Sequence, residues 1–242
     1  MHLDELVFIF MIVLLAGFVQ GLTSFGFALI SMPLLVKLIP MQQAVPVVVA
    51  LSLFTNVAVL YSSRKHIRIK QIWPLLAASL LAAPLGTYAL LYVPANALKL
   101  GAGLLVAVVS ILMLSGKSFP LGRLAYVPVG AVSGFLNGSI SMSGPPVALF
   151  LTNQGLDKMT FRANITAYAL ILNIITIGTY AYEGLLNETA MKTVGWAVPA
   201  LIIGVVIGIK AVGRLNDKLF KTIALWLILI TGIWTALGGL IG

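Results

Sequence analysis

The sequence predicts an all-α, polytopic membrane protein with two inverted-topology repeats, each a broken helical hairpin followed by three transmembrane helices. Composition, the placement of charge and two polar interruptions of apolar sequence lead to this fold class. Of the 242 residues, 60% are hydrophobic and 9% are charged, whereas soluble domains have about 45–50% apolar and about 25% charged residues. The composition excludes an ordinary cytosolic enzyme, a disordered chain and, despite a formal net charge of +9, a nucleic-acid-binding protein.

Eight uncharged apolar stretches follow one another along the chain. A helix needs about 20 apolar residues to cross the hydrocarbon core, and each stretch reaches or approaches that length. They cover residues 6–36, 43–63, 71–98, 100–116, 124–156, 163–182, 193–209 and 222–242. The first stretch is preceded by Asp4 and Glu5, where a signal peptide has basic residues, so we expect it to stay in the fold.

The basic residues fix the expected orientation. Twelve of the fifteen fall in four connections between the stretches: Arg64, Lys65, Arg68, Lys70, Lys117, Arg123, Lys158, Arg162, Lys210, Arg214, Lys218 and Lys221. The positive-inside rule places these connections in the cytoplasm. Residues 6–36 and 124–156 must then each return to the side from which they entered, as hairpins inserted from opposite faces. Both termini are expected on the side of the membrane opposite the cytoplasm.

Each expected hairpin has a polar break. The first is residues 20–26 (QGLTSFG), and the second is residues 137–146 (NGSISMSGPP). Glycine and proline interrupt helices, and in a membrane the freed backbone groups must lie against protein or a water-filled cavity. A break of this kind indicates a substrate site, and the alternative is close helix packing or a simple turn.

Recurring residues indicate an internal duplication. Gly17-x-x-x-Gly21 corresponds to Gly130-x-x-x-Gly134, 113 positions later, as Pro33 does to Pro146, and Asn56 corresponds to Asn173 at 117. We expect a first repeat over residues 1–118, with a hairpin over 5–39 and spans over 43–63, 71–92 and 98–116. The second covers 119–242, with a hairpin over 124–156 and spans over 163–183, 193–210 and 221–241. Inverted repeats with broken helices are typical of secondary transporters.

The two breaks supply hydrogen-bond donors suited to a small oxyanion. Helix N-termini attract anions without basic side chains. We expect Ser143 to be an N-cap, Pro145 to begin the returning helix, and Ser24 to have the equivalent role in the first hairpin. All six acidic residues lie at or beyond the ends of the spans, whereas a cation carrier more often buries a carboxylate. The expected substrate-binding residues are Gln20, Thr23, Ser24, Phe25, Gly26, Asn56, Asn137, Gly138, Ser139, Ser141, Ser143, Gly144, Pro145 and Asn173.

Three polar residues outside the breaks have two interpretations each. Asn56 and Asn173 lie within apolar spans, where an amide needs a partner. They either join helices through hydrogen bonds or also face the substrate. Arg162 either attracts anions at the cytoplasmic mouth or anchors its helix at the membrane interface.

The glycine and proline pattern resembles that of the TauE/SafE sulfite exporter family. The resemblance rests on Gly17, Gly21, Gly26 and Pro33, on the repeated glycines with the segment 143–146, and on the segment 161–164 (FRAN). It covers essentially the whole chain. It implies a bacterial inner-membrane transporter for small sulfur-containing anions such as sulfite, sulfoacetate or other organosulfonates.

The expected function is therefore secondary transport of such an anion by alternating access. The alternatives are an anion channel and a carrier of another small anion, such as a carboxylate. No residue set supports an enzyme, and we expect neither a cofactor nor a metal. The expected partners are a small anionic substrate and the lipid bilayer, with no nucleic acid; a homo-oligomer stays open.

Overall fold

The computed structural model describes residues 3–114, 122 and 125–241, and this part of the chain is helical without any strand. The expected basic residues Lys117 and Arg123 lie outside the described residues. The helices are α1 (Leu3–Thr23), α2 (Phe27–Leu35), α3 (Met41–Ser63), the short 3-10 helix η1 (Arg64–His66), α4 (Ile69–Tyr92), α5 (Ala95–Leu114), α6 (Tyr126–Ile140), α7 (Gly144–Asn153), α8 (Lys158–Tyr182), α9 (Glu188–Val212) and α10 (Asp217–Ile241).

Six of these helices are long and apolar enough to cross a membrane: α1, α3, α4, α8, α9 and α10. The outward faces of the long helices carry large apolar side chains, such as Leu81 and Tyr182, which are 80% and 88% exposed. Water would not solvate such a surface favourably, whereas lipid does. The chain is thus an all-helical membrane protein.

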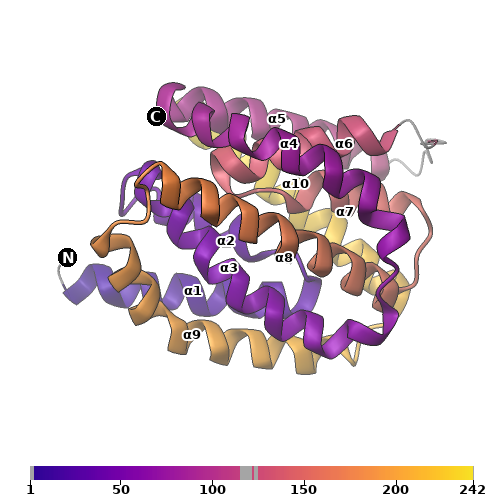
Figure 1. Ribbon diagram of the computed structural model, residues 1–242. Helices are drawn as coiled ribbons and strands as arrows, with labels where there is room; N and C mark the ends of the chain where they lie inside the picture. The colour runs from indigo at the N-terminus through magenta and orange to yellow at the C-terminus, as the bar shows by residue number, and fades with distance from the viewer. Residues whose placement is uncertain (1–2, 115–121, 123–124, 242) are drawn as a thin grey trace.

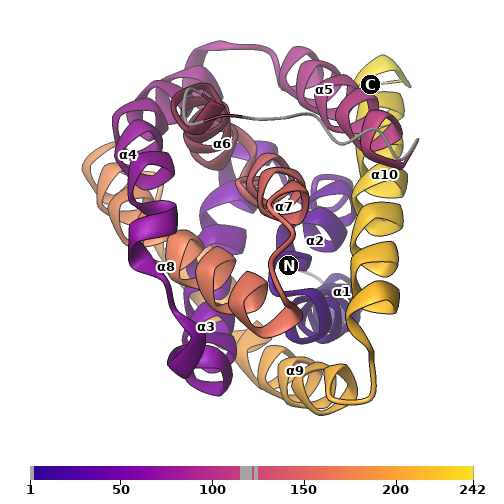
Figure 2. The ribbon, with the colours of Figure 1, turned by 90° about the vertical axis from the view of Figure 1, so that its right-hand side faces the viewer.

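The apolar sequence is interrupted where the breaks are expected. Residues 24–26 separate α1 from α2, and residues 141–143 separate α6 from α7. α2, α6 and α7 have 9, 15 and 10 residues, or about 14, 22 and 15 Å, so none of them crosses a hydrocarbon core of about 30 Å. α1, with 21 residues, is long enough to cross on its own. Figure 2 shows α2 and α7 inside the ring of longer helices.

Helices from the two halves of the chain pack in pairs, α1 along α9, α4 along α6 and α5 along α10 (Figure 1). Glycines allow this close approach. A Cβ atom on Gly134 would collide with the backbone of Ser79, and one on Gly208 would collide with the backbone of Phe18. Gly204, four residues before Gly208, lies equally close to the backbone of Leu14.

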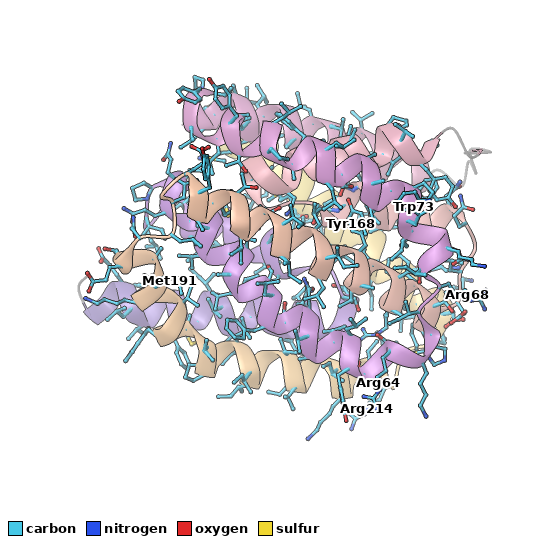
Figure 3. The ribbon with its side chains drawn as sticks, in the orientation of Figure 1. Arg64, Arg68, Trp73, Tyr168, Met191 and Arg214 are labelled. Carbon is cyan, nitrogen blue, oxygen red and sulfur yellow. The ribbon has the colours of Figure 1, made fainter. Side chains whose placement is uncertain are left out.

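The two ends of the bundle differ in charge. Arg64, Arg68 and Arg214 gather at one end, and Met191 lies at the other (Figure 3). The two termini lie at the end opposite the arginines (Figure 1). We call the arginine side the basic end and the other the outer end.

Polar N-caps explain why α8 and α9 begin earlier than their apolar sequence does. α8 begins at Lys158 because the carboxylate of Asp157 accepts hydrogen bonds from the backbone N–H groups of Met159 and Thr160, at 3.0 and 2.9 Å. α9 begins at Glu188 because Asn187 accepts from Ala190 N at 2.9 Å. Polar N-caps can start a helix within charged sequence. A search for uncharged apolar stretches does not include such residues.

Candidate functional site

A left-handed serine ends the first helix of each hairpin. Ser24 and Ser141 have φ angles of 76° and 61° and are the described non-glycine residues with positive φ. The N–H groups of Ser24 and Ser141 donate to the carbonyls of Gln20 and Asn137, at 2.7 and 3.0 Å. This conformation costs a non-glycine residue about 1–2 kcal/mol, so the surrounding contacts must hold it.

The N-caps of the returning helices lie two residues after these serines. The N-cap of α7 is Ser143, with Pro145 in the first turn, whereas the N-cap of α2 is Gly26. The expectation that Ser24 starts α2 is wrong, because Ser24 is instead the residue that terminates α1. Ser143 holds the N-cap position but makes no side-chain capping bond.

The side chain of Gln20 holds the first break together. Its Nε2 donates to Ser24 O at 3.1 Å and to Asn56 Oδ1 at 2.9 Å. Its Oε1 accepts from Phe27 N, the first N–H of α2, at 2.9 Å. One buried amide therefore joins the end of α1, the start of α2 and the neighbouring helix α3.

Asn137 has a related position in the second hairpin. Its Nδ2 donates to Asn173 Oδ1 at 3.0 Å and to Thr176 Oγ1 at 2.9 Å, both on α8. The hydroxyl of Tyr180 donates to the carbonyls of Asn137 and Gly138. The interhelical hydrogen bonds expected for Asn56 and Asn173 are confirmed.

A buried tyrosine supports the second break. The Tyr168 hydroxyl, in the interior of the bundle in Figure 3, donates to Ser133 Oγ at 2.7 Å and contacts Ser79 Oγ. Ser133 Oγ in turn donates to the carbonyl of Ser143 at 2.6 Å. This chain of hydroxyls joins α4, α8 and α6 to the start of α7. Sequence reasoning missed Tyr168, because one aromatic residue in an apolar span carries no distinguishing signal.

The two breaks meet inside the bundle. A Cβ atom on Gly144 would lie 3.0 Å from Cβ of Phe25, so the tip of one hairpin touches the tip of the other. Between them is a cavity of about 30 Å³. One water needs about 10–15 Å³ of such volume, so this cavity has room for about two water-sized groups. It must widen before it can hold a larger ligand.

Most of the expected site residues line this central cavity. Those that do are Gln20, Ser24, Phe25, Asn56, Asn137, Ser141, Ser143, Gly144, Pro145 and Asn173. Further lining residues, which sequence reasoning did not single out, are Phe27, Ala28, Leu29, Ser52, Met142, Ile165, Tyr168 and Ala169.

Four expected residues lie outside the lining. The hydroxyls of Thr23 and Ser139 donate to carbonyls of their own helices, at Val19 and Phe135. Gly26 packs against the preceding helix α1, and Gly138 packs against α4. These residues stabilise the hairpins: the two hydroxyls bond their own helices, and the two glycines contact neighbouring helices.

The cavity offers hydrogen-bond donors and no carboxylate. The Oγ of Ser24 is buried without a partner among the described residues. Asn56 and Asn173 each accept through Oδ1, and no hydrogen bond between described residues uses either Nδ2. The backbone N–H groups of Ala28 and Leu29 lie in the first turn of α2, where no carbonyl of the same helix pairs with them.

The start of α7 contributes fewer donors than the start of α2. Its first residues are Gly144, Pro145 and Pro146, and proline has no N–H. Gly144 is therefore the one N–H donor among these three positions. The dipole of α7 still directs positive potential toward the cavity, but without an array of backbone hydrogen bonds.

Arg162 lies beside the first break and not at an open mouth. It is 1% exposed, and its Nη1 donates to the carbonyls of Gly21 and Leu22 at 3.0 and 2.7 Å. The guanidinium thus caps the C-terminal end of α1. Its Nε and Nη2 are buried without a partner among the described residues, as is Oγ1 of Thr166, one turn further along α8.

Three aromatic rings lie on the basic-end side of the first tip. The ring of Phe25 makes an edge contact with Phe161 at 6.1 Å between centroids, and Phe161 makes one with Phe220 at 5.5 Å. Phe161 and Phe220 lie in the first turns of α8 and α10. This row runs from the central cavity, which Phe25 lines, to the first turns of two helices.

The family model described as "Sulfite exporter TauE/SafE" matches residues 9–235, nearly the whole chain. No curated protein and no solved structure matches the chain.

Proposed function

Because the chain belongs to the TauE/SafE family of sulfite exporters, whose members are membrane transporters, we propose that it is a secondary transporter of small sulfur-containing anions. The proposed substrates are sulfite, sulfoacetate and other organosulfonates. The anion binds in the central cavity between the two helix breaks and crosses a bacterial inner membrane by alternating access.

The observation that carries this proposal is the donor set of the cavity. A bound oxyanion accepts from Ser24 Oγ and from the amides of Asn56 and Asn173. It also lies at the positive ends of α2 and α7. No acidic residue lines the cavity, so nothing there repels an anion or neutralises a bound cation.

Alternating access is supported by two equivalent hairpins inserted from opposite sides. Gln20 and Asn137 each donate to an asparagine 36 positions further on. Ser24 and Ser141 share the left-handed conformation. These pairs, like Asn56 and Asn173, are 117 positions apart.

Two glycines that pack on the other half of the chain have the same offset, whereas the residues that they contact, Ser79 and Leu201, are 122 positions apart. Gly17 packs on Leu201 of α9, as Gly134 packs on Ser79 of α4. This favours an offset of 117 for the two hairpins, with Gly17 equivalent to Gly134, over the offset of 113 that the glycine spacing alone indicated. Two halves of this kind can exchange conformations across one shared site.

Arg162 has a role in opening toward the basic end. Its Nε and Nη2 form the side-on edge with which arginine binds an oxyanion through two parallel hydrogen bonds, and here both are free of described partners. When the row of Phe25, Phe161 and Phe220 separates, this edge can receive the anion on its way to or from the cytoplasm. The positive-inside rule assigns the basic end to the cytoplasm and the termini to the periplasm.

The test is transport by purified protein in liposomes. We expect saturable movement of labelled sulfite or sulfoacetate, with counterflow, above protein-free vesicles. Conductance at channel rates would identify the alternative anion channel, and movement of carboxylates in place of sulfur-containing anions would identify another carrier. If no small anion moves, the proposal is wrong.

A further inference from the structure

A second, much larger cavity lies at the outer end, between α2, α5 and α10. Its volume is about 870 Å³, within the range of small-molecule sites. Apolar side chains make up most of its wall, including Met32, Ile230, Ile233 and Trp234. Its deepest part reaches Ile140 and Met142 at the tip of the second hairpin.

The charged residues of this cavity are lysines. Lys37 and Lys99 both line it, and no acidic residue does. Lys37 Nζ lies 5.7 Å from the ring centroid of Trp234, which holds the ammonium over the cavity wall. Neither lysine forms an ion pair with a described carboxylate, whereas Lys192, the other lysine of the outer connections, pairs with Glu188 at 2.6 Å.

This placement runs against the general charge bias of the chain. Twelve of its fifteen basic residues fall in the connections assigned to the basic end. Two of the remaining three lie on one cavity without a counter-charge. In a cavity with low-dielectric walls, two such charges raise the local concentration of anions.

The outer cavity adjoins the central one. Met142 lines both, and no other described residue does. Methionine is unbranched and flexible, so a rotation of this side chain changes the separation between the two cavities. On its other side the central cavity is lined by Phe25, whose ring contacts Phe161, which in turn contacts Phe220.

We propose that the outer cavity is a second binding site, an outer vestibule for a soluble organic anion. The oxyanion head pairs with Lys37 and Lys99, and a short apolar body packs against methionine, isoleucine and Trp234. This inference rests on the proposed function for the nature of the ligand. It adds that the protein accepts anions with a carbon skeleton from the outer end.

A single introduced thiol tests the vestibule without any measurement of transport. The chain has no cysteine, and Thr235, a small residue of the vestibule wall, is a conservative position for one. Thr235→Cys is modified in phosphatidylcholine vesicles by two membrane-impermeant methanethiosulfonates, one with a sulfonate and one with a trimethylammonium group. The Lys37→Gln/Lys99→Gln pair is then added, and Lys192→Gln is the matched control. Gly238→Cys replaces Thr235→Cys if the latter does not fold.

We expect the ratio of anionic to cationic modification rates to fall at least tenfold in the double lysine variant and to stay unchanged in Lys192→Gln. Isethionate, a small soluble organosulfonate, should protect the thiol, and this protection should also require the lysines. An unchanged ratio in the double variant overturns the proposal, even if transport is normal. Protection by phosphatidylglycerol but not by isethionate also overturns it, because the occupant is then a lipid.

Discussion

The hydroxyl of Ser24 gives the sharpest test of the central site. It is completely buried and has no partner among the described residues. A buried hydroxyl without a partner costs about 1–3 kcal/mol. Ser24→Ala removes that penalty, so the free energy of unfolding should be unchanged or higher.

Binding should respond in the opposite direction. If the hydroxyl donates to a bound oxyanion, its loss removes a hydrogen bond to a charged group, about 1.5–3 kcal/mol. At about 1.4 kcal/mol for each tenfold change, the Kd should rise about 10- to 150-fold. A stable protein with weak binding distinguishes a ligand contact from a structural one.

Calorimetric titration with sulfite and thermal unfolding, both in detergent, give the two quantities. Ser110→Ala is the control, because this serine is equally buried but donates to Val106 O on α5, away from the cavity. Its sulfite affinity should equal that of the unmodified protein. Unchanged affinity in Ser24→Ala would refute the placement of the anion at the first break.

Three further substitutions test the framework by thermal unfolding in detergent. Gly134→Ala should destabilise the protein by about 1–3 kcal/mol, since its Cβ would collide with the α4 backbone. The control Gly195→Ala should not, because its Cβ would meet nothing within 4 Å. Equal effects of the two substitutions would refute the close packing. Tyr168→Phe should lower stability by about 1–3 kcal/mol, because two serine hydroxyls lose their shared partner, and an unchanged unfolding temperature would contradict this. Asp157→Ala should cost about 1 kcal/mol at neutral pH. The backbone N–H of Thr160 lowers the pKa of Asp157 below 3.8 in the folded protein. The stability that the cap contributes is therefore present above the unfolded pKa and is lost as the pH falls through the folded pKa. If Asp157→Ala is still less stable than the unmodified protein in acid, the cap is refuted.

Several features of the site could be predicted because they depend on chemistry close together in the chain. Glycines, prolines and hydroxyl side chains within apolar sequence locate both breaks. Such a run favours an interruption of the helix, and its freed backbone groups are tolerated only against protein or a water-filled cavity. Interhelical hydrogen bonds of Asn56 and of Asn173 could be predicted, because an amide without a partner among apolar side chains is unfavourable.

Other features could not be predicted because they depend on contacts between distant segments. Ser24 was expected to begin α2, yet Gln20 takes the first free N–H of that helix and Ser24 ends α1 instead. Arg162 was expected either at the cytoplasmic mouth or as an anchor at the membrane interface, yet it is buried against carbonyls 140 and 141 positions earlier. No local pattern contains such pairings.

The sequence by itself determined the membrane location, the helical class, the sites of the two breaks and the absence of acidic groups between them. These follow from how each short segment interacts with lipid or water and from which backbone conformations its residues permit. Only the tertiary structure decided which donors face the central cavity and that Lys37 and Lys99 share an outer one. Those arrangements depend on the rotation and depth of each helix in the bundle. Both are set where helix backbones touch, at glycines such as Gly134 and Gly208. Such packing is a property of a pair of helices and not of either helix alone.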